Sequence, residues 1–200
     1  FGPAQISAEH ADDRPYVIGG QRMYAIGMMS GAPPRVGDEH LVGDMGGLWA
    51  LRFKAVSSWG VGVSQPGRPA LTLVPQAFGG ESWRVERLRE GDGVRVIESE
   101  WIDEDDAVLF VEATVTNTGE RARRLRIRLH IAPDLQPCWM GAALRGRSVV
   151  TRSAREIAAR STTQTAIGVV ALGAQPLGTD HTLAPGASCT VRMVVAAAHD

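Results

Sequence analysis

The sequence has little of several features that identify common classes of protein. Only two of its 200 residues are cysteines, too few for a disulfide framework, so Cys138 and Cys189 form either one bridge or two free thiols. Acidic and basic residues nearly balance, and a net charge of −1 gives no long-range attraction to nucleic acid or to an anionic membrane. Apolar runs such as 167–171 and 194–198 have only the length of strands, which excludes a membrane-spanning helix. The first residues lack a signal-peptide pattern, and we expect a cytoplasmic protein.

Sequence motifs of catalysis and of cofactor binding are also missing. There is no Gly-x-Ser-x-Gly, no His-Glu-x-x-His and no phosphate-binding glycine loop. The five histidines are not spaced as metal ligands, and we expect neither a metal nor another cofactor. Carboxylates are numerous between Glu98 and Asp106, but they are crowded on one predicted strand and turn. We interpret them as solvent-facing charges rather than as the paired acid and base of a glycosidase.

Two runs of alternating apolar residues dominate the middle of the chain. One covers 109–115, the other covers 125–131, and the turn signal Asn-Thr-Gly-Glu at 117–120 lies between them. Because successive side chains of a strand point to opposite faces, each run predicts a strand with one buried face. The short connection favours antiparallel pairing of the two strands, and 94–101 adds a third. We expect a buried set and an exposed set: Leu109, Val111, Val115, Leu125, Ile127 and Leu129 inside, and Arg124, Arg126 and Arg128 outside.

Short strands separated by turns account for most of the remaining chain. Only 153–160 has a weak helical pattern, and we expect at most one short helix, at this position. Neither a repeat nor a linker divides the sequence. The prediction is an all-β fold, a large antiparallel β-sandwich formed by residues 1–200 as a single domain. Further strands are predicted at 16–20, 23–27, 48–56, 59–63, 83–88, 167–172 and 189–195.

The segment 37–59 is the strongest candidate for a binding site. It begins with a loop that is long for a compact all-β domain, and long ordered loops are often functional. A glycine pair precedes an indole in it; glycines let a backbone approach a ligand closely, and indole faces stack on sugars. The alternative is that Trp49 and Trp59 are anchors of the core. The predicted substrate-binding residues are Met45, Gly46, Gly47, Trp49, Arg52, Lys54 and Trp59.

Arginines gather at 121–128, on the polar face of a predicted strand. Polar residues belong on the wet face of an antiparallel sheet, so we interpret this stripe as a solvated surface. No aromatic residues alternate with the arginines, as a base-stacking platform for nucleic acid would require. We expect no nucleic-acid partner and no membrane partner.

Several segments resemble one family of carbohydrate-active proteins. The residues YVIGGQRMYAIG at 16–27 and DMGGLWA at 44–50 are similar to the opening of bacterial glycoside hydrolase family 63-like and glycogen-debranching-type proteins. The similarity extends over 16–195 and is thin between 140 and 182. The first block is fairly specific, whereas the Asn-Thr-Gly and Pro-Gly turns are common in β-sandwiches. Further similar motifs lie at 98–102, 115–119, 132–135 and 183–186.

The resemblance implies an N-terminal super-β-sandwich that packs on a following (α/α)6 barrel. In such enzymes the barrel carries the acid and the base of an inverting hydrolysis. The sequence contains no such barrel, so no catalytic residue is carried over to it. Only the loop at 45–49 is a candidate for reaching the cleft of the barrel.

Three functions are compatible with these patterns. The first, which we favour, is a non-catalytic accessory domain of an α-glycosidase, with the barrel and a carbohydrate as its partners. The second is a free-standing carbohydrate-binding module that uses Trp49, Trp59 or Trp83 as a sugar platform. The third is a mutarotase-like epimerase, which needs a positioned acid and base. His130 is the one histidine in the middle of a predicted strand, and it lies on the arginine face.

Overall fold

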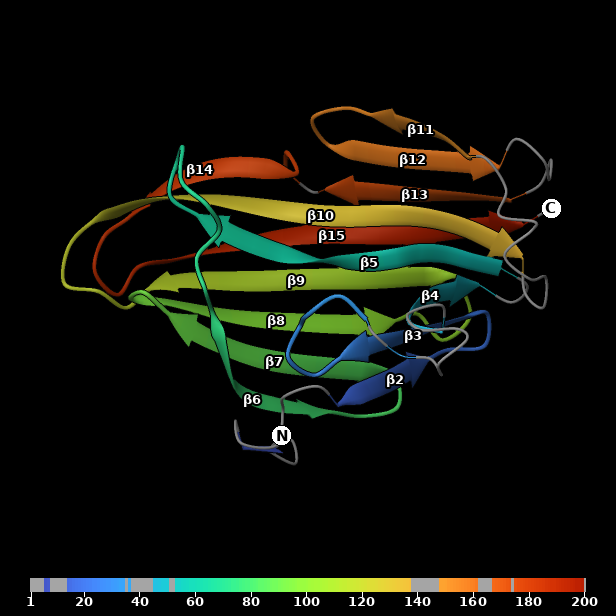
Figure 1. Ribbon diagram of the computed structural model, residues 1–200, viewed down its shortest axis with the longest axis horizontal. Helices are drawn as coiled ribbons and strands as arrows, with labels where there is room; N and C mark the ends of the chain where they lie inside the picture. The colour runs from blue at the N-terminus through green and yellow to red at the C-terminus, as the bar shows by residue number, and fades with distance from the viewer. Residues whose placement is uncertain are drawn as a thin grey trace.

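The chain folds into two antiparallel sheets that pack as a sandwich (Figure 1). Within the described part it consists of strands and turns and contains no helix, which confirms the predicted all-β sandwich. None of its segments there is a helix that could cross a membrane. The computed structural model describes residues 6–7, 14–34, 36, 45–50, 53–137, 148–161, 167–173 and 175–199.

Six strands form the smaller sheet, in the spatial order β14-β10-β5-β4-β3-β2. β2 and β3 pair antiparallel and correspond to the predicted strands 16–20 and 23–27. The predicted strand 48–56 covers β4 and the first residues of β5, and the predicted strand 59–63 lies within β5, so the predicted boundary between these two strands is wrong. In chain order the strands are β2 (Pro15–Gly19), β3 (Met23–Met28), β4 (Gly47–Ala50), β5 (Phe53–Ser64), β10 (Arg123–Pro137) and β14 (Gly178–Leu183).

Nine strands form the larger sheet, in the order β1-β6-β7-β8-β9-β15-β13-β12-β11. Most neighbours in it are also neighbours in the sequence, as in a meander, whereas the last strand returns to lie between β9 and β13. In chain order the strands are β1 (Ile6–Ser7), β6 (Val74–Gly80), β7 (Arg84–Gly91), β8 (Val94–Ile102), β9 (Val108–Asn117), β11 (Ser148–Arg152), β12 (Glu156–Ser161), β13 (Ile167–Gly173) and β15 (Ser188–His199).

The apolar inner faces of the two sheets meet in one core. Alternate residues of β9 and β10 point into it, because each strand keeps the period of two that its sequence shows. The prediction of the buried set is confirmed. Leu109, Val111, Val115, Leu125, Ile127 and Leu129 are each at most 5% exposed.

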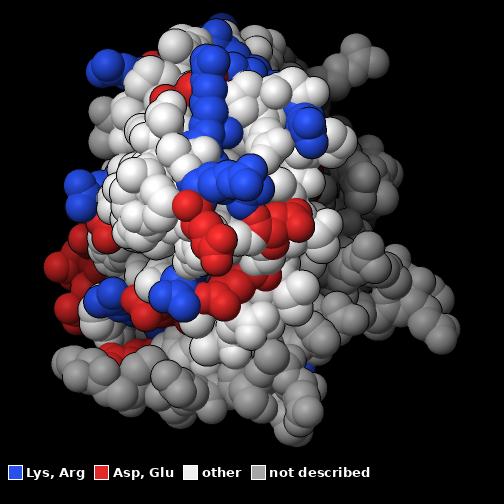
Figure 2. All heavy atoms as spheres, turned by 90° about the vertical axis from the view of Figure 1, so that its left-hand side faces the viewer, with Lys and Arg blue, Asp and Glu red and all other residues white. Residues whose placement is uncertain are grey.

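The arginine stripe lies on the outer face of the smaller sheet. Arg124 and Arg128 are exposed as predicted, whereas Arg126 is half-buried. Arg126 Nε donates to Asp180 Oδ1 at 2.6 Å, and Arg124 Nη2 donates to Asp180 Oδ2 at 2.9 Å. On the end of the sandwich that Figure 2 shows, acidic and basic side chains lie side by side. Part of the positive charge of the stripe is therefore compensated within the surface itself.

The predicted pairing of the two central runs is wrong. β9 and β10 lie in different sheets, because the connection at 118–122 crosses from one sheet to the other. The buried side chain of Asn117 fixes this crossing: its Nδ2 donates to the carbonyls of Arg121 at 2.8 Å and Leu183 at 2.9 Å, and its Oδ1 accepts from Gly119 N. Alternation specifies which face of a strand is buried but not which strand lies beside it, and both arrangements bury the same residues.

The weak helical pattern at 153–160 does not form a helix, which agrees with the expectation of at most one. The Ser153 hydroxyl accepts hydrogen bonds from the backbone N–H of Arg155 at 3.3 Å and of Glu156 at 3.1 Å, which makes a turn at the start of this segment. The chain then continues as β12, paired with β11 on one side and β13 on the other. Backbone hydrogen bonds to two neighbours outweigh a weak helical pattern.

The smaller sheet has a gap beside β5. β4 is four residues long and pairs only with the first part of β5, so among the described residues 57–62 have no strand partner on that side. Residues 29–34, which follow β3 and which we call the covering segment, pass over this gap (Figure 1). The interior of the sandwich is therefore closed here by a loop and not by a strand.

Replacing Ile127 by Ala tests the register of β10. Ile127 is 1% exposed, so the loss of its side chain should lower the free energy of unfolding by about 2–5 kcal/mol in a denaturant titration. Arg128→Ala is the matched control, because it changes the next residue, which is exposed; it should change the free energy by less than about 0.5 kcal/mol. Equal effects of the two substitutions would mean that the register is wrong by one residue.

Candidate functional site

Five polar side chains lie inside the sandwich next to the gap, and we call them the inner polar cluster. Arg87 and Arg89 come from β7, Glu98 and Glu100 from β8, and Tyr16 from β2 of the opposite sheet. On each strand these residues alternate with outward ones and so share the inner face with the apolar core. Two guanidinium groups and two carboxyl groups meet in this way between the sheets.

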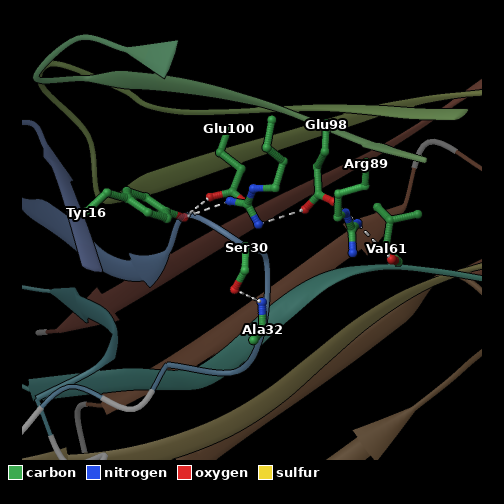
Figure 3. A network of polar contacts seen from close by, with 8 residues as sticks. Tyr16, Ser30, Ala32, Val61, Arg89, Glu98 and Glu100 are labelled. Atoms are coloured by element: carbon green, nitrogen blue, oxygen red, sulfur yellow. Dashed lines mark hydrogen bonds and ion pairs between the residues drawn. The ribbon is translucent and has the colours of Figure 1, made fainter. Parts of the chain in front are cut away.

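Hydrogen bonds and ion pairs connect the cluster into one chain (Figure 3). The Tyr16 hydroxyl donates to Glu100 Oε2 and accepts from Arg87 Nη2 at 2.9 Å. Arg87 Nη2 also donates to Glu100 Oε1 at 2.5 Å, and its Nη1 lies 3.6 Å from Glu98 Oε1. Arg89 Nη2 donates to Glu98 Oε2 at 2.6 Å. Each carboxyl group is therefore held by at least one guanidinium.

The two carboxyl groups differ in their acidity. Burial opposes the ionisation of Glu98, but Arg87 and Arg89 outweigh it and hold the pKa of Glu98 below its usual value. Burial, together with the charge of Glu98, raises the pKa of Glu100 despite the attraction of Arg87. The pKa of the Tyr16 hydroxyl is raised well above its usual value, first by burial and then by the charge of Glu100. Glu98 is thus the stronger acid of the pair, and Glu100 keeps its proton more readily.

The interpretation of these carboxylates as solvent-facing charges is wrong for Glu98 and Glu100. Both are at most 1% exposed. The sequence contains the signal that would have found them: they continue the same alternation as Val94 and Val96, and Ile102 follows in phase. A charged residue at a position where the alternation predicts burial is normally interpreted as a break in the strand pattern and not as a buried side chain. Here the guanidinium groups of the neighbouring strand compensate it.

The covering segment seals the cluster from outside. Gly31 has a φ of +77° and lies so close to the guanidinium of Arg87 that an added Cβ would be 3.1 Å from Nη1. Both the backbone conformation and the close approach favour glycine at this position. The cavity that remains has a volume of about 10 Å³, enough for one water molecule. It is lined by Tyr16, Gly27, Met28, Gly31, Ala32, Pro34, Trp59, Arg87 and Glu100.

The predicted substrate-binding residues fall at two separate places. Trp49 lies on the outer face of the smaller sheet, stacked on Tyr24 with ring centroids 6.2 Å apart, and Lys54 Nζ lies 5.8 Å from its centroid. Tyr24 and Lys54 are its cross-strand neighbours on β3 and β5, so both faces of the indole are in contact with protein. Trp59 points inward, is 8% exposed and belongs to the core beside the inner polar cluster.

The glycine pair shapes the backbone beside Trp49. Gly47 has a φ of +126°, and a Cβ there would lie 2.3 Å from the carbonyl oxygen of Val56, so a side chain does not fit. Trp49 Nε1 donates to the carbonyl oxygen of Met45 at 2.9 Å and so holds the start of this turn, where Met45 is 49% exposed. Gly46 is buried against Pro34 of the covering segment. The structure thus brings together Met45, Gly46, Gly47, Trp49 and Lys54, and we call residues 45–49 of this group the edge at 45–49.

The remaining candidates are easily placed. Lys54 is buried, with its Nζ 3.5 Å from Asp134 Oδ2, and Arg52 lies outside the described residues. Cys189 is a free thiol, and Cys138 lies outside the described residues. The structure as described holds no group of three or more histidine, cysteine or acidic side chains arranged as metal ligands.

Solved structures with a similar fold come from carbohydrate-active proteins. A protein from the human microbiome described as a kojibiose phosphorylase is 10% identical, with a TM-score of 0.53, over 92% of this chain and 30% of that one. The galactosidase domain of the α-galactosidase–sucrose kinase AgaSK is 10% identical, with a TM-score of 0.51, over 97% and 41%. A protein from Escherichia coli K12 described as an aldose 1-epimerase is 10% identical, with a TM-score of 0.53, over 94% and 99%.

These comparisons show the fold and do not identify a family. No protein-family model matches the sequence, and no curated protein matches it significantly. The chain spans less than half the length of the phosphorylase and of the galactosidase domain, and nearly the whole of the epimerase. The same sandwich thus forms part of two larger proteins and nearly the whole of the protein described as an aldose 1-epimerase.

Removing Arg87 tests how far the cluster depends on charge compensation. Arg87→Leu leaves Glu98 with one guanidinium and Glu100 with none, and should cost about 3–5 kcal/mol of unfolding free energy in denaturant. The matched control is Arg95→Leu, which removes an exposed ion pair with Glu90 and should cost less than about 1 kcal/mol. If the two variants were equally stable, the cluster would contribute no more than a surface pair.

Proposed function

We propose that this chain is the non-catalytic β-sandwich domain of an α-glycosidase of the family 63-like and glycogen-debranching type. Its role is to support an (α/α)6 catalytic barrel and to form part of the wall of the active-site cleft. The sequence motifs at 16–27 and 44–50 support this family. The sandwich fold, shared with parts of two larger glycoside-active proteins, supports the role of one domain among several.

The observation that most strongly supports the proposal is that the carboxyl groups of the inner polar cluster are engaged by arginine and buried from solvent. Inverting hydrolysis needs an acid and a base about 6.5–9.5 Å apart, on opposite sides of a sugar, with room for a water molecule. Glu98 and Glu100 come from the same strand and are both held by Arg87. With the covering segment in place, the cavity beside them is about 10 Å³ and has no room for a sugar. The acid and base of the parent enzyme therefore come from elsewhere.

The edge formed by residues 45–49 is the part that we propose to meet the barrel. Trp49 holds it in shape through its stacking and its hydrogen bond to Met45, while Met45 itself is exposed. The two glycines let Pro34 of the covering segment and the backbone of β5 pack closely against the edge. In this proposal Trp49 shapes the wall of the cleft, and the exposed Met45 contacts the carbohydrate or the barrel.

A free-standing carbohydrate-binding module is less well supported. A sugar platform needs an open aromatic face, but both faces of Trp49 are covered and Trp59 is in the core. Trp83 is 45% exposed, but its Nε1 donates to the side chain of the nearby Glu81 at 3.0 Å. Titration with maltose, trehalose or mannosylglycerate should reveal no saturation below millimolar concentrations. Micromolar binding that Trp49→Ala abolishes would favour the module instead.

The epimerase alternative has one specific observation in its favour. The ring of His130 and the Oε1 atom of Glu98 both lie beside Gly60: a Cβ added there would be 3.2 Å from His130 Cε1 and 3.6 Å from Glu98 Oε1. Desolvation lowers the pKa of His130, as a general base at neutral pH requires. Glu98 is 1% exposed, however, and Arg87 and Arg89 hold its pKa below the usual value, so it is a poor proton donor for a substrate. Mutarotation of glucose or galactose by residues 1–200 would favour this alternative.

Activity of the chain alone and in a longer polypeptide tests the proposal. Residues 1–200 should hydrolyse no α-glycoside, because they present no acid and base across a cleft. The same region joined to its downstream barrel should be active, and Trp49→Ala should reduce that activity without unfolding the protein. The matched control is Trp83→Ala, which changes an exposed tryptophan between β6 and β7 of the larger sheet and should leave activity unchanged. Hydrolysis by residues 1–200 alone would contradict the accessory role.

A further inference from the structure

The inner polar cluster and its surroundings contain buried polar atoms without a hydrogen bond. Among the described residues there are four such side-chain atoms: Trp59 Nε1, Arg87 Nε, Arg89 Nε and Glu98 Oε1. Glu98 Oε1 lies 3.6 Å from Arg87 Nη1, a distance that allows an ion pair but is too long for a hydrogen bond. Buried polar atoms are nearly always paired, because an unpaired atom loses its hydration and gains nothing in return. Three of these atoms belong to the cluster and the fourth, Trp59 Nε1, lies beside it, so together they offer hydrogen bonds to an additional polar group.

Two of these atoms face the gap in the smaller sheet. Trp59, which is 8% exposed, lines the small cavity together with Arg87. Glu98 Oε1 lies beside Gly60, the next residue of β5, since a Cβ added to Gly60 would be 3.6 Å away from it. Figure 3 shows Glu98 and the rest of the cluster above β5, with Ser30 and Ala32 of the covering segment below the cluster in this view. An unpaired donor on Trp59 and an unpaired acceptor beside Gly60 therefore lie at consecutive residues of β5.

The composition of the cluster specifies the class of group that fits. Two guanidinium groups face two carboxyl groups, so an added charge of either sign would be left without compensation inside the sandwich. The unpaired atoms are three N–H donors and one carboxylate acceptor. A hydroxyl group donates and accepts at once and can pair with both kinds of atom. Several hydroxyls on a compact neutral carbon frame therefore match the site better than an anion, a cation or an apolar group.

The covering segment is attached in a way that allows it to move. Its hydrogen bonds are Gly31 N to Met28 O at 2.9 Å, Ala32 N to Ser30 Oγ at 3.3 Å and Met29 N to Arg14 O at 2.9 Å. None of the described hydrogen bonds joins it to β5 or to the inner polar cluster. Its contact with Arg87 is made through a glycine, without a side chain. Displacing this segment exposes the cluster without breaking a strand.

We propose that the inner polar cluster is a binding site for a neutral polyol, a single sugar residue, that enters through the gap beside β5 when the covering segment is displaced. Trp59 Nε1 and Glu98 Oε1 hydrogen-bond its hydroxyls. The oxygens of Glu98 and Glu100 that already accept from arginine or tyrosine stay engaged, so the sugar is bound and not transformed. This site is distinct from the edge at 45–49 and does not depend on the accessory role proposed above.

Nuclear magnetic resonance of the tryptophan indole N–H groups in the 200-residue chain tests the site. Glucose, galactose and, as a charged analogue, glucuronate are the probes. Binding displaces the cover and forms few hydrogen bonds, so we expect dissociation constants of roughly 1–10 mM for the neutral sugars. The resonance of Trp59, identified by its loss in Trp59→Phe, should shift saturably. Glucuronate should bind at least about tenfold more weakly, because its charge is uncompensated in the site.

Two tryptophan variants separate this site from the surface. Trp59→Phe keeps an aromatic ring in the core but removes Nε1, and should weaken glucose binding about tenfold, the effect of one lost hydrogen bond. Trp83→Phe is the matched control and should leave the affinity unchanged. No saturable shift of Trp59 in the unmodified chain, or equal binding of glucuronate, would overturn the proposal. Because no barrel and no hydrolysis are involved, the result is independent of the proposed accessory function.

Discussion

The contact of Arg87 with Glu98 and Glu100 is the interaction on which the rest of the structure depends. Burying two carboxyl groups between sheets is costly unless guanidinium groups accompany them, and Arg87 contacts both. Through the Tyr16 hydroxyl it also connects the two sheets, since β2 and β7 belong to different ones. The same contact determines the chemistry: carboxyl groups engaged in this way stabilise the fold and are not available for acid–base catalysis. The proposed accessory role rests on the engaged atoms of this contact, and the proposed sugar site rests on the unpaired atoms beside it.

Most of the fold could be predicted from the period of the apolar residues. Alternation over 109–115 and 125–131 identified the strands and their buried faces correctly, because burial is a property of a single strand. Pairing is a property of two strands, and the predicted pairing was wrong. Asn117 turns the chain into the other sheet through hydrogen bonds to the carbonyls of Arg121 and Leu183, and Leu183 lies 66 residues further along the chain, outside the range of a local pattern. The weak helical pattern at 153–160 does not become a helix for the same reason, because two neighbouring strands decide the conformation of this segment.

The candidate site was harder to predict, because its residues are polar and face inward. From the sequence alone, Glu98 and Glu100 are interpreted as outward charges. Their burial is explained by the register of β7 and β8, which places Arg87 opposite Glu98. The edge at 45–49 was visible in the sequence because a glycine pair beside an indole is a local signal. Its geometry was not: the faces of Trp49 are covered by Tyr24 and Lys54, which are brought beside it by strand pairing.

The pH titration of the side-chain carboxyl carbons of Glu98 and Glu100, followed by carbon-13 nuclear magnetic resonance, tests the central claim most directly. Solvated glutamates titrate near pH 4.3. If the arginines hold the cluster together, Glu98 should remain ionised at pH values below this, because its pKa is lowered, while Glu100 should take up its proton at higher pH, because its pKa is raised. The ion pairs of Glu98 should then contribute stability above its usual pKa that is lost as the pH falls through the lowered one. Titration of both residues near the solvated value would contradict the account, since it would mean that the carboxyl groups are neither buried nor held by Arg87.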